Sequence, residues 1–229
     1  MATKYFTLSF DDGTVHDRRM IAMLDHFGIK CTFNLNSDRL GTVHTFRQGG
    51  LVCDHSEVTA EEVASLYRDH EVAAHGLDHR TFTKLDDAAL ISEAEDDRKR
   101  LAELSRQHVI GCAYPNGPFD EHVKRILKER TGIRYARTVN STYEFDLPTD
   151  WYEWNPTVCL DDDSVFLIAE RFLTEPSDAD QLFYVWGHSY NFDRLHTWDR
   201  LESFLRMMAY RTNLAYVTNR EFYEKMQQR

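Results

Sequence analysis

Two periods of hydrophobic residues alternate along this chain. Short apolar, β-branched and aromatic runs have the composition of buried strands and cover residues 4–10, 29–35, 70–74, 109–114, 134–139, 157–160, 182–186 and 214–217. Between them, apolar residues three or four positions apart predict helices over 17–27 and 87–105, and from residues 59, 120, 164, 197 and 219 onward. Residues 36–58 contain three glycines and are predicted to form a loop.

A strand followed by a helix, repeated seven or eight times, predicts a parallel sheet with helices outside it. The 229 residues show no internal repeat or linker, so we expect one domain over residues 1–229. An open doubly wound sheet and a closed (β/α) barrel both fit this length. The barrel is favoured because the unexplained polar residues all follow strand C-termini, the rim where barrel sites assemble.

The first strand ends in two adjacent carboxylates, Asp11 and Asp12, followed by Gly13. Such a pair is costly unless a cation lies between the two side chains. A divalent metal would meet this need, with one aspartate as a ligand and the other free to move protons. The alternative is an Asp-Asp-Gly turn whose side chains are solvated.

His75 and His79 follow the strand predicted over 70–74, with a spacing that lets one turn aim both imidazoles at one ion. Alone, the pair could be incidental, because the chain has eleven histidines. Asp12 on another strand end strengthens the interpretation, since one aspartate and two histidines leave a position for water, as in catalytic zinc sites.

Two further segments allow either a chemical or a purely structural role. His188 follows the most apolar strand and is either a general acid or a hydrogen-bonded core histidine. The segment Tyr114-Pro115-Asn116-Gly117 is either a simple turn or a source of a backbone N–H for an oxyanion. The remaining histidines outside these motifs are interpreted as surface or packing residues, namely His16, His26, His44, His55, His108, His122 and His196.

Composition narrows the range of partners. The formal net charge of −11, with no basic run to offset it, argues against nucleic acid and against an anionic membrane surface. No apolar run is long enough to span a membrane and no signal peptide precedes the first strand, so a cytoplasmic location is expected unless an export segment was removed. The four cysteines are widely spaced, which favours free thiols over disulfides.

The motifs, in order, resemble the polysaccharide deacetylases of the NodB-homology type, carbohydrate esterase family four. They are Ser-Phe-Asp-Asp-Gly at 9–13, His-Glu-Val-x-x-His-Gly-x-x-His at 70–79, Tyr-Pro-Asn-Gly at 114–117 and Val-Trp-Gly-His at 185–188. The resemblance spans nearly the whole chain. It implies a distorted (β/α) barrel of seven or eight parallel strands and a metal-dependent hydrolase that removes N-acetyl, or O-acetyl, groups from a carbohydrate.

The resemblance also implies roles by position. Asp12, His75 and His79 match the metal ligands, with Zn²⁺ expected and Co²⁺ or another divalent ion as the alternative. Asp11 matches the catalytic base and His188 the catalytic acid. The Asn116 amide matches the oxyanion donor, and Pro115 and Gly117 help to shape the groove.

The chain departs from the family pattern in two places. Ala113 stands where the family's third motif usually has an arginine that braces the base, and we hypothesise that Arg137 on the next strand replaces it. The aspartate-tryptophan signature of the fourth motif is matched only loosely, by Asp150-Trp151. Trp151, Trp154 and Tyr190 are candidates for the walls of a sugar site, with core packing as the alternative.

These departures leave three functions open. The first is deacetylation of an acetylated saccharide, and the second is hydrolysis of a small non-glycan amide on the same fold, which the missing arginine and the expected location favour. The third is a carbohydrate-binding homologue without catalysis, which the presence of Asp11 and His188 argues against. The sequence does not indicate the oligomeric state.

Overall fold

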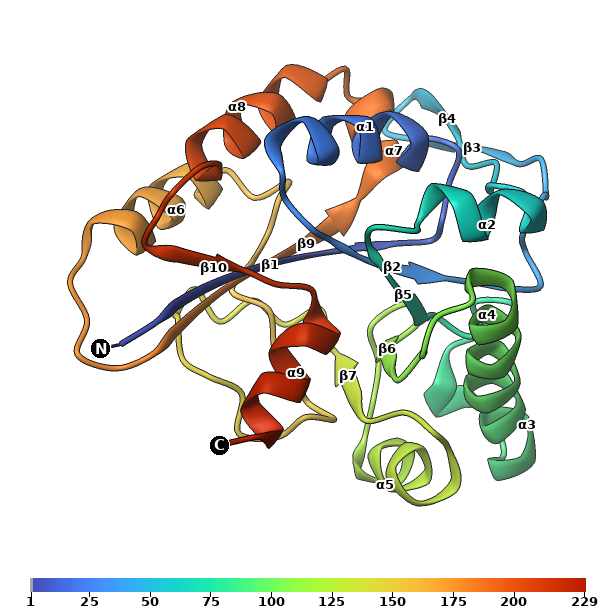
Figure 1. Ribbon diagram of the computed structural model, residues 1–229. Coiled ribbons are helices and arrows are strands. Elements are labelled where there is room, and N and C mark those ends of the chain that lie inside the picture. The colour runs from blue at the N-terminus through green and yellow to red at the C-terminus, as the bar shows by residue number, and fades with distance from the viewer. Residues whose placement is uncertain (1) are drawn as a thin grey trace.

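The computed structural model describes residues 2–229 and contains one main sheet and one separate hairpin (Figure 1). Within these residues the main sheet has eight strands, and all of its strand pairs are parallel. They are β1 (Lys4–Asp11), β2 (Thr32–Leu35), β5 (Glu71–Ala74), β6 (Gly111–Ala113), β7 (Tyr135–Arg137), β8 (Val158–Cys159), β9 (Gln181–His188) and β10 (Leu214–Tyr216). The hairpin pairs β3 (Thr45–Gln48) with β4 (Leu51–Asp54).

Helices follow most strands and lie outside the sheet (Figure 1). They are α1 (Asp17–Phe27), α2 (Ala60–Leu66), α3 (Asp87–Ile91), α4 (Asp97–Ser105), α5 (Glu121–Arg130), α6 (Val165–Thr174), α7 (Ser189–Arg194), α8 (Trp198–Met208) and α9 (Asn219–Gln227). The helix predicted over 87–105 is continuous, but a π-helical segment, Ser92–Asp96, joins α3 to α4. The predicted alternation of strands and helices is therefore confirmed.

Strand β1 lies between β2 and β9 in the strand order β7-β6-β5-β2-β1-β9-β8, and it also pairs with β10. The sheet curls into a partial barrel, and the segment between β7 and β8 bridges its two ends. In this segment the Trp154 N–H donates to the Ala136 carbonyl of β7, and the Trp154 carbonyl accepts from the Thr138 N–H. The Thr157 N–H donates to the Tyr184 carbonyl of β9. The distorted barrel expected from the sequence is confirmed.

Alternate residues of β1 face different layers, as the period of two requires. Phe6, Leu8 and Phe10 belong to the large core between the sheet and the helices. Tyr5 points the other way, into a second cluster inside the barrel that Phe222 of α9 completes. Asp11 lies on the same side of the strand as Tyr5 but at the opposite end. The aromatic cluster thus fills one end of the barrel and leaves the C-terminal end for polar side chains.

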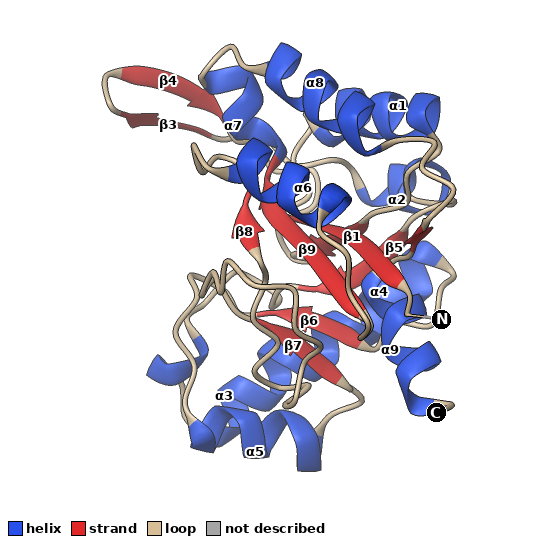
Figure 2. Cartoon of the chain, turned by 90° about the vertical axis from the view of Figure 1, so that its left-hand side faces the viewer, coloured by secondary structure: helices blue, strands red, loops and turns tan. Residues whose placement is uncertain are grey.

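The hairpin β3–β4 replaces the loop that was predicted over residues 36–58. It projects from the barrel beside α7 (Figure 2). A Gly49-Gly50 turn between two short strands is a hairpin signal that the sequence does contain. The loop prediction was therefore wrong in its type of structure, though not in its position outside the sheet.

Two expectations from composition can be compared with the structure. All four cysteines are free, and three of them are buried. Among residues 2–229, no helix is long and apolar enough to cross a membrane.

A buried carboxylate ties three helical segments together. Asp17 in the first turn of α1 accepts hydrogen bonds from the Tyr67 hydroxyl at 2.7 Å and the Ser189 hydroxyl at 2.5 Å. Burial raises the pKa of Asp17 to about 7, although both hydrogen bonds oppose this shift. The folded protein therefore holds a proton on Asp17 that the unfolded chain releases near pH 4.

We expect the stabilisation from protonated Asp17 to be lost as the pH rises from about 4 through about 7, because only the folded state keeps the proton in that interval. The free energy of unfolding of the wild type, relative to that of Asp17→Asn, should fall across this window by roughly 4 kcal/mol. Urea unfolding at several pH values, with a chelator present, measures this difference. A difference that does not change with pH would contradict the prediction.

Candidate active site

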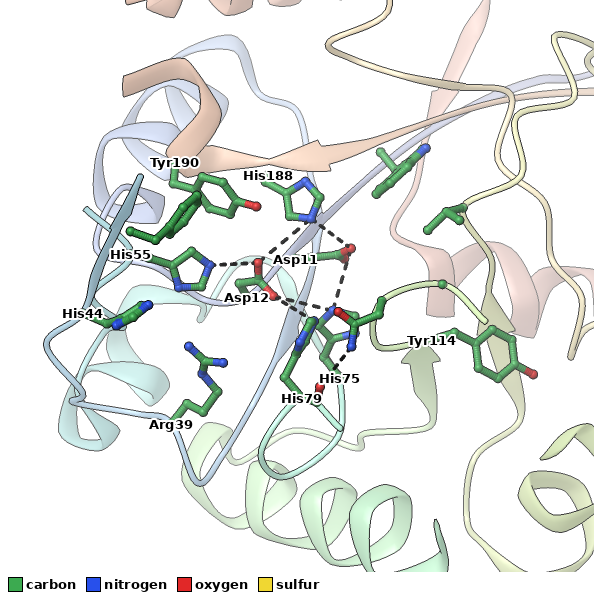
Figure 3. A pocket seen from close by; sticks show the side chains of 15 residues that line it. Asp11, Asp12, Arg39, His44, His55, His75, His79, Tyr114, His188 and Tyr190 are labelled. Atoms are coloured by element: carbon green, nitrogen blue, oxygen red, sulfur yellow. Dashed lines mark hydrogen bonds and ion pairs between the residues drawn. The ribbon is translucent and has the colours of Figure 1, made fainter. Parts of the chain in front are cut away.

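The C-terminal ends of the strands surround a cavity of about 370 Å³ (Figure 3). Its floor contains Asp11, Asp12 and His75. One wall consists of side chains from residues 39–55, which contain the hairpin and are called the hairpin segment. This is the end of the barrel at which the sequence predicted the site, and it is where active sites occur in (β/α) barrels.

The two aspartates lie side by side where β1 ends. Asp11 is the last residue of the strand and is in register with Asn34 of β2 and His188 of β9. Asp12 follows with a left-handed φ of 78°, which turns its side chain toward the cavity. Non-glycine residues rarely adopt this conformation, and it is concentrated at functional sites.

His75 and His79 approach Asp12 from the loop after β5. Their Nε2 atoms lie 3.6 Å and 3.5 Å from Oδ1 of Asp12. The loop is held in place by Asn36, whose side chain donates to the carbonyls of His75 and Gly76, and by Asp97, which accepts from the His75 backbone N–H at 3.0 Å. Asp12, His75 and His79 thus converge as predicted.

This triad fits a divalent metal ion. One potential ligand atom from each residue lies within 4.8 Å of the other two. Nδ1 of His75 is 2.9 Å from the Ala113 carbonyl, a contact that requires the proton on Nδ1 and leaves the lone pair on Nε2. Burial and the neighbouring His75 lower the pKa of His79 to about 4, so this imidazole is neutral at neutral pH. One carboxylate and two imidazoles form a donor set typical of catalytic zinc.

Arg137 forms a buried ion pair with Asp11. Its Nη2 donates to the two carboxylate oxygens at 2.6 Å and 2.5 Å, and both side chains are almost inaccessible to solvent. The guanidinium also stacks on the Trp186 ring at 4.6 Å. Burial alone would raise the pKa of Asp11, but the charge of Arg137, helped by His75 and His188, keeps this pKa below its ordinary value.

The position of Arg137 explains how it reaches Asp11. Arg137 ends β7 and is in register with Ala113 of β6, the residue that stands where the family's third motif usually has its arginine. The guanidinium therefore enters the barrel at the same level as an arginine at position 113, from the adjacent strand. The structure brings Arg137 and Asp11 together, as hypothesised.

His188 closes the opposite side of the aspartate pair. Its Nε2 lies 3.9 Å from Oδ2 of Asp11 and 4.0 Å from Oδ2 of Asp12. The side chain is only partly buried and lines the cavity, so it remains accessible to a ligand. His188 is therefore a cavity residue and not an enclosed core histidine.

The turn after β6 contributes Asn116 and Gly117 to the cavity. Asn116 has a left-handed φ of 61°, and its side chain donates to the His79 carbonyl and the Thr81 hydroxyl. Gly117 has a φ of 94°, and a Cβ there would lie 2.6 Å from Val139. Both residues are thus placed by a backbone conformation that the turn requires. Pro115 is buried and does not line the cavity.

Known proteins share a sequence family and a fold with this chain. The sequence profile of the polysaccharide deacetylase family matches residues 1–136, more than half of the chain. The chain belongs to the polysaccharide deacetylase family. Family members are hydrolases that act on carbon–nitrogen bonds. A search of curated proteins finds no match.

Solved structures share the fold of this polysaccharide deacetylase family member. A Mycobacterium smegmatis protein described as a polysaccharide deacetylase is 14% identical, with a TM-score of 0.70 over 99% of this chain and 91% of the other. Peptidoglycan deacetylase PdaC from Bacillus subtilis is 14% identical, with a TM-score of 0.60 over 99% of this chain and 93% of the other.

A third structure matches over a shorter region. Streptococcus pyogenes deacetylase PplD, in complex with acetate, is 18% identical, with a TM-score of 0.51 over 59% of this chain. The chain spans 56% of the length of that protein. At these identities the three structures establish a common fold.

Asp150 and Trp151, which the sequence matched loosely to the fourth motif, do not lie at the cavity. Asp150 pairs with Lys124 at 2.7 Å, and Trp151 packs against Trp154 and Tyr223 at the other end of the barrel. The segment is used to bridge the ends of the sheet, which directs these side chains away from the cavity. Of the aromatic residues proposed as sugar-site walls, only Tyr190 lines the cavity.

Sequence reasoning missed the residues that the hairpin segment supplies. Arg39, His44, Phe46 and His55 all line the cavity. His55 was interpreted as a surface or packing residue, but its Nε2 lies 3.1 Å from Oδ2 of Asp12. The Gly49-Gly50 turn could have predicted the hairpin. No sequence signal indicates that His55, directly after β4, contacts Asp12.

Proposed function

We propose that this cavity hydrolyses the N-acetyl group of a saccharide, releasing acetate and a free amine. The observation that supports this proposal is the convergence of three groups at one cavity. They are the Asp12, His75 and His79 triad, an aspartate paired with arginine, and a partly exposed histidine. We further propose that residues 1–229 act together as one catalytic domain.

Asp12, His75 and His79 would hold the metal, with Zn²⁺ as the proposed ion because one carboxylate and two imidazoles suit it. When bound, the ion supplies Lewis acidity and favours the ionised form of water near pH 7. The low pKa of Asp11 keeps this carboxylate ionised and able to accept a proton from water that attacks the acetyl carbon.

The remaining steps use groups on the cavity rim. The backbone N–H of Asn116 is proposed to donate to the oxygen that becomes negative as the tetrahedral intermediate forms. His188 then gives a proton to the nitrogen as the carbon–nitrogen bond breaks, so that the amine leaves uncharged. Nε2 of His188 and Oδ2 of Asp11 lie 3.9 Å apart, so both groups can reach the same bound acetamide.

One observation favours a small amide as a second candidate substrate. The hairpin segment adds Arg39, His44 and Phe46 as a wall on one side of the cavity. Such a wall limits the length of a bound chain in that direction. The same residues would carry out the chemistry on a short substrate.

Acetate release from a panel of N-acetylated mono- and oligosaccharides and small acetamides tests the proposal. Acetate release from a saccharide by the wild type, but not by Asp11→Asn, would support deacetylation. Release only from small amides would replace the saccharide with the second candidate. A protein that binds Zn²⁺ but releases no acetate from any compound would overturn the proposed activity.

Removal of metal is expected to lower the rate of acetate release at least ~100-fold, because the ion would supply several kcal/mol of charge stabilisation. Treatment with a chelator, followed by dialysis and addition of Zn²⁺ or Co²⁺, measures this loss and its recovery. Full activity in protein shown to be metal-free by elemental analysis would contradict the prediction.

A further inference from the structure

His55 connects the hairpin to the aspartate of the metal triad (Figure 3). Its Nε2 lies 3.1 Å from Oδ2 of Asp12, and its Nδ1 forms an ion pair with Oε1 of Glu57 at 3.3 Å, without the geometry of a hydrogen bond. All three side chains are nearly buried. A carboxylate oxygen therefore faces each nitrogen of the imidazole.

Glu57 is fixed in position by several groups. Arg39 donates to its Oε1 from Nε at 3.0 Å and lies 2.9 Å away through Nη2, and the Thr42 hydroxyl donates to its Oε2. The backbone around Glu57 pairs with the residues that follow Asp12, through a bridge between Thr14 and Glu57. The pairing continues in bonds between Val15 and Ser56 and between Val58 and Gly13. Glu57 is thus a rigid support behind His55.

Aromatic neighbours fix the plane of the His55 ring. The ring centroid lies 4.7 Å from that of Tyr190 on α7 and 5.6 Å from that of Phe46 on β3. The imidazole is therefore held on its sides by two elements and at its ends by two carboxylates.

The two oxygens of Asp12 have different partners. Oδ1 faces His75 and His79, at 3.6 Å and 3.5 Å, whereas Oδ2 faces His55. Groups that hydrogen-bond a ligand side chain from behind fix its orientation and strengthen metal binding. We propose that His55, supported by Glu57, is a positioning residue that holds Oδ2 of Asp12 and thereby presents Oδ1 to the metal, an inference that rests on the metal site of the proposed function.

Two amide substitutions separate the two nitrogens of His55. In His55→Gln the side-chain nitrogen can occupy the place of Nε2 and still donate to Asp12. In His55→Asn the nitrogen corresponds to Nδ1, so the contact with Asp12 is lost. We expect His55→Asn to raise the Kd for Zn²⁺ about 10- to 100-fold and His55→Gln to raise it less than about threefold.

The measurements are the Kd for Zn²⁺ from competition with a chromophoric chelator and the visible absorption spectrum of bound Co²⁺. His16→Asn is the control, because His16 contacts the Asp54 carbonyl and so tethers the same hairpin without touching Asp12. We expect the control to keep the wild-type Kd and Co²⁺ spectrum. Thermal unfolding without metal identifies any variant that does not fold.

A second variant keeps the test decisive if His55→Asn is unfolded. Glu57→Gln keeps the shape of the support and removes the charge behind His55, and it is expected to weaken Zn²⁺ binding about tenfold. The positioning role would be overturned if His55→Gln and His55→Asn had equal Kd values for Zn²⁺ and equal Co²⁺ spectra. If His55→Asn is unfolded, a wild-type Kd in Glu57→Gln would overturn it. So would failure of the wild type to bind either ion.

The positioning role of His55 and the proposed deacetylase activity can fail independently, and the measurements distinguish the two failures. Zn²⁺ binding that depends on His55 in a protein that releases no acetate would support the positioning role and overturn the deacetylase activity. Acetate release by variants that all have the same Zn²⁺ affinity would support the deacetylase activity and overturn the positioning role.

Discussion

Replacing Asp11 by asparagine is expected to lower kcat for acetate release about a thousandfold, within the ~10²–10⁴ range that a positioned acid or base contributes. Asparagine keeps the shape of the side chain and can still face Arg137, but its amide cannot accept a proton from water. The loss should appear in kcat more than in KM, because proton transfer occurs in the transition state.

Zn²⁺ affinity provides the internal control for Asp11→Asn. Asp11 is not part of the triad, so the Kd for Zn²⁺ should stay within about threefold of the wild-type value while kcat falls. Unchanged kcat in a fully loaded variant would exclude Asp11 as the base. A loss of kcat that parallels a loss of bound metal would assign Asp11 to metal binding instead.

Replacing Arg137 by alanine is expected to destabilise the protein by about 3–5 kcal/mol, because it leaves the buried Asp11 carboxylate without its partner. The same change removes the charge that holds the pKa of Asp11 low, so this pKa should rise. If Asp11 is the base, the acidic limb of the pH profile of kcat/KM then moves to higher pH. Urea unfolding and the pH profile measure the two effects.

A double variant separates the charge of Arg137 from its packing. In Asp11→Asn combined with Arg137→Met, both charges are gone and the methionine can still pack near Trp186. We expect this double variant to recover much of the stability that Arg137→Ala loses, because no buried charge remains unpaired. Arg137→Ala with wild-type stability and rate would refute the bracing role.

The parts of the fold that could be predicted from sequence are those determined by local patterns. Apolar β-branched runs determine the strands, and their alternation with amphipathic segments determines a parallel sheet. Since parallel strands end on the same side, Asp12, His75 and His188 had to lie at one edge. Their convergence followed from strand order and from the spacing within 75–79, without any knowledge of the tertiary contacts.

The parts that could not be predicted depend on contacts between distant segments. Asp11 and Arg137 are 126 positions apart, and their pairing depends on the register of β6 with β7. His55 reaches Asp12 because the residues that follow it, 56–58, pair with residues 13–15. Asp150 and Trp151 were misplaced because their segment closes the barrel, and nothing in its local sequence distinguishes closure from a site loop.

Three residues that line the cavity have an unfavourable backbone conformation. Asp12, His79 and Asn116 all have positive φ values without being glycine. Each such conformation costs of the order of 1 kcal/mol or more, which the surrounding contacts must offset. Alanine at these positions would remove the functional group and keep the backbone cost, whereas glycine would remove both. An alanine scan of this cavity therefore combines lost chemistry with retained strain, and glycine is the reference that separates the two.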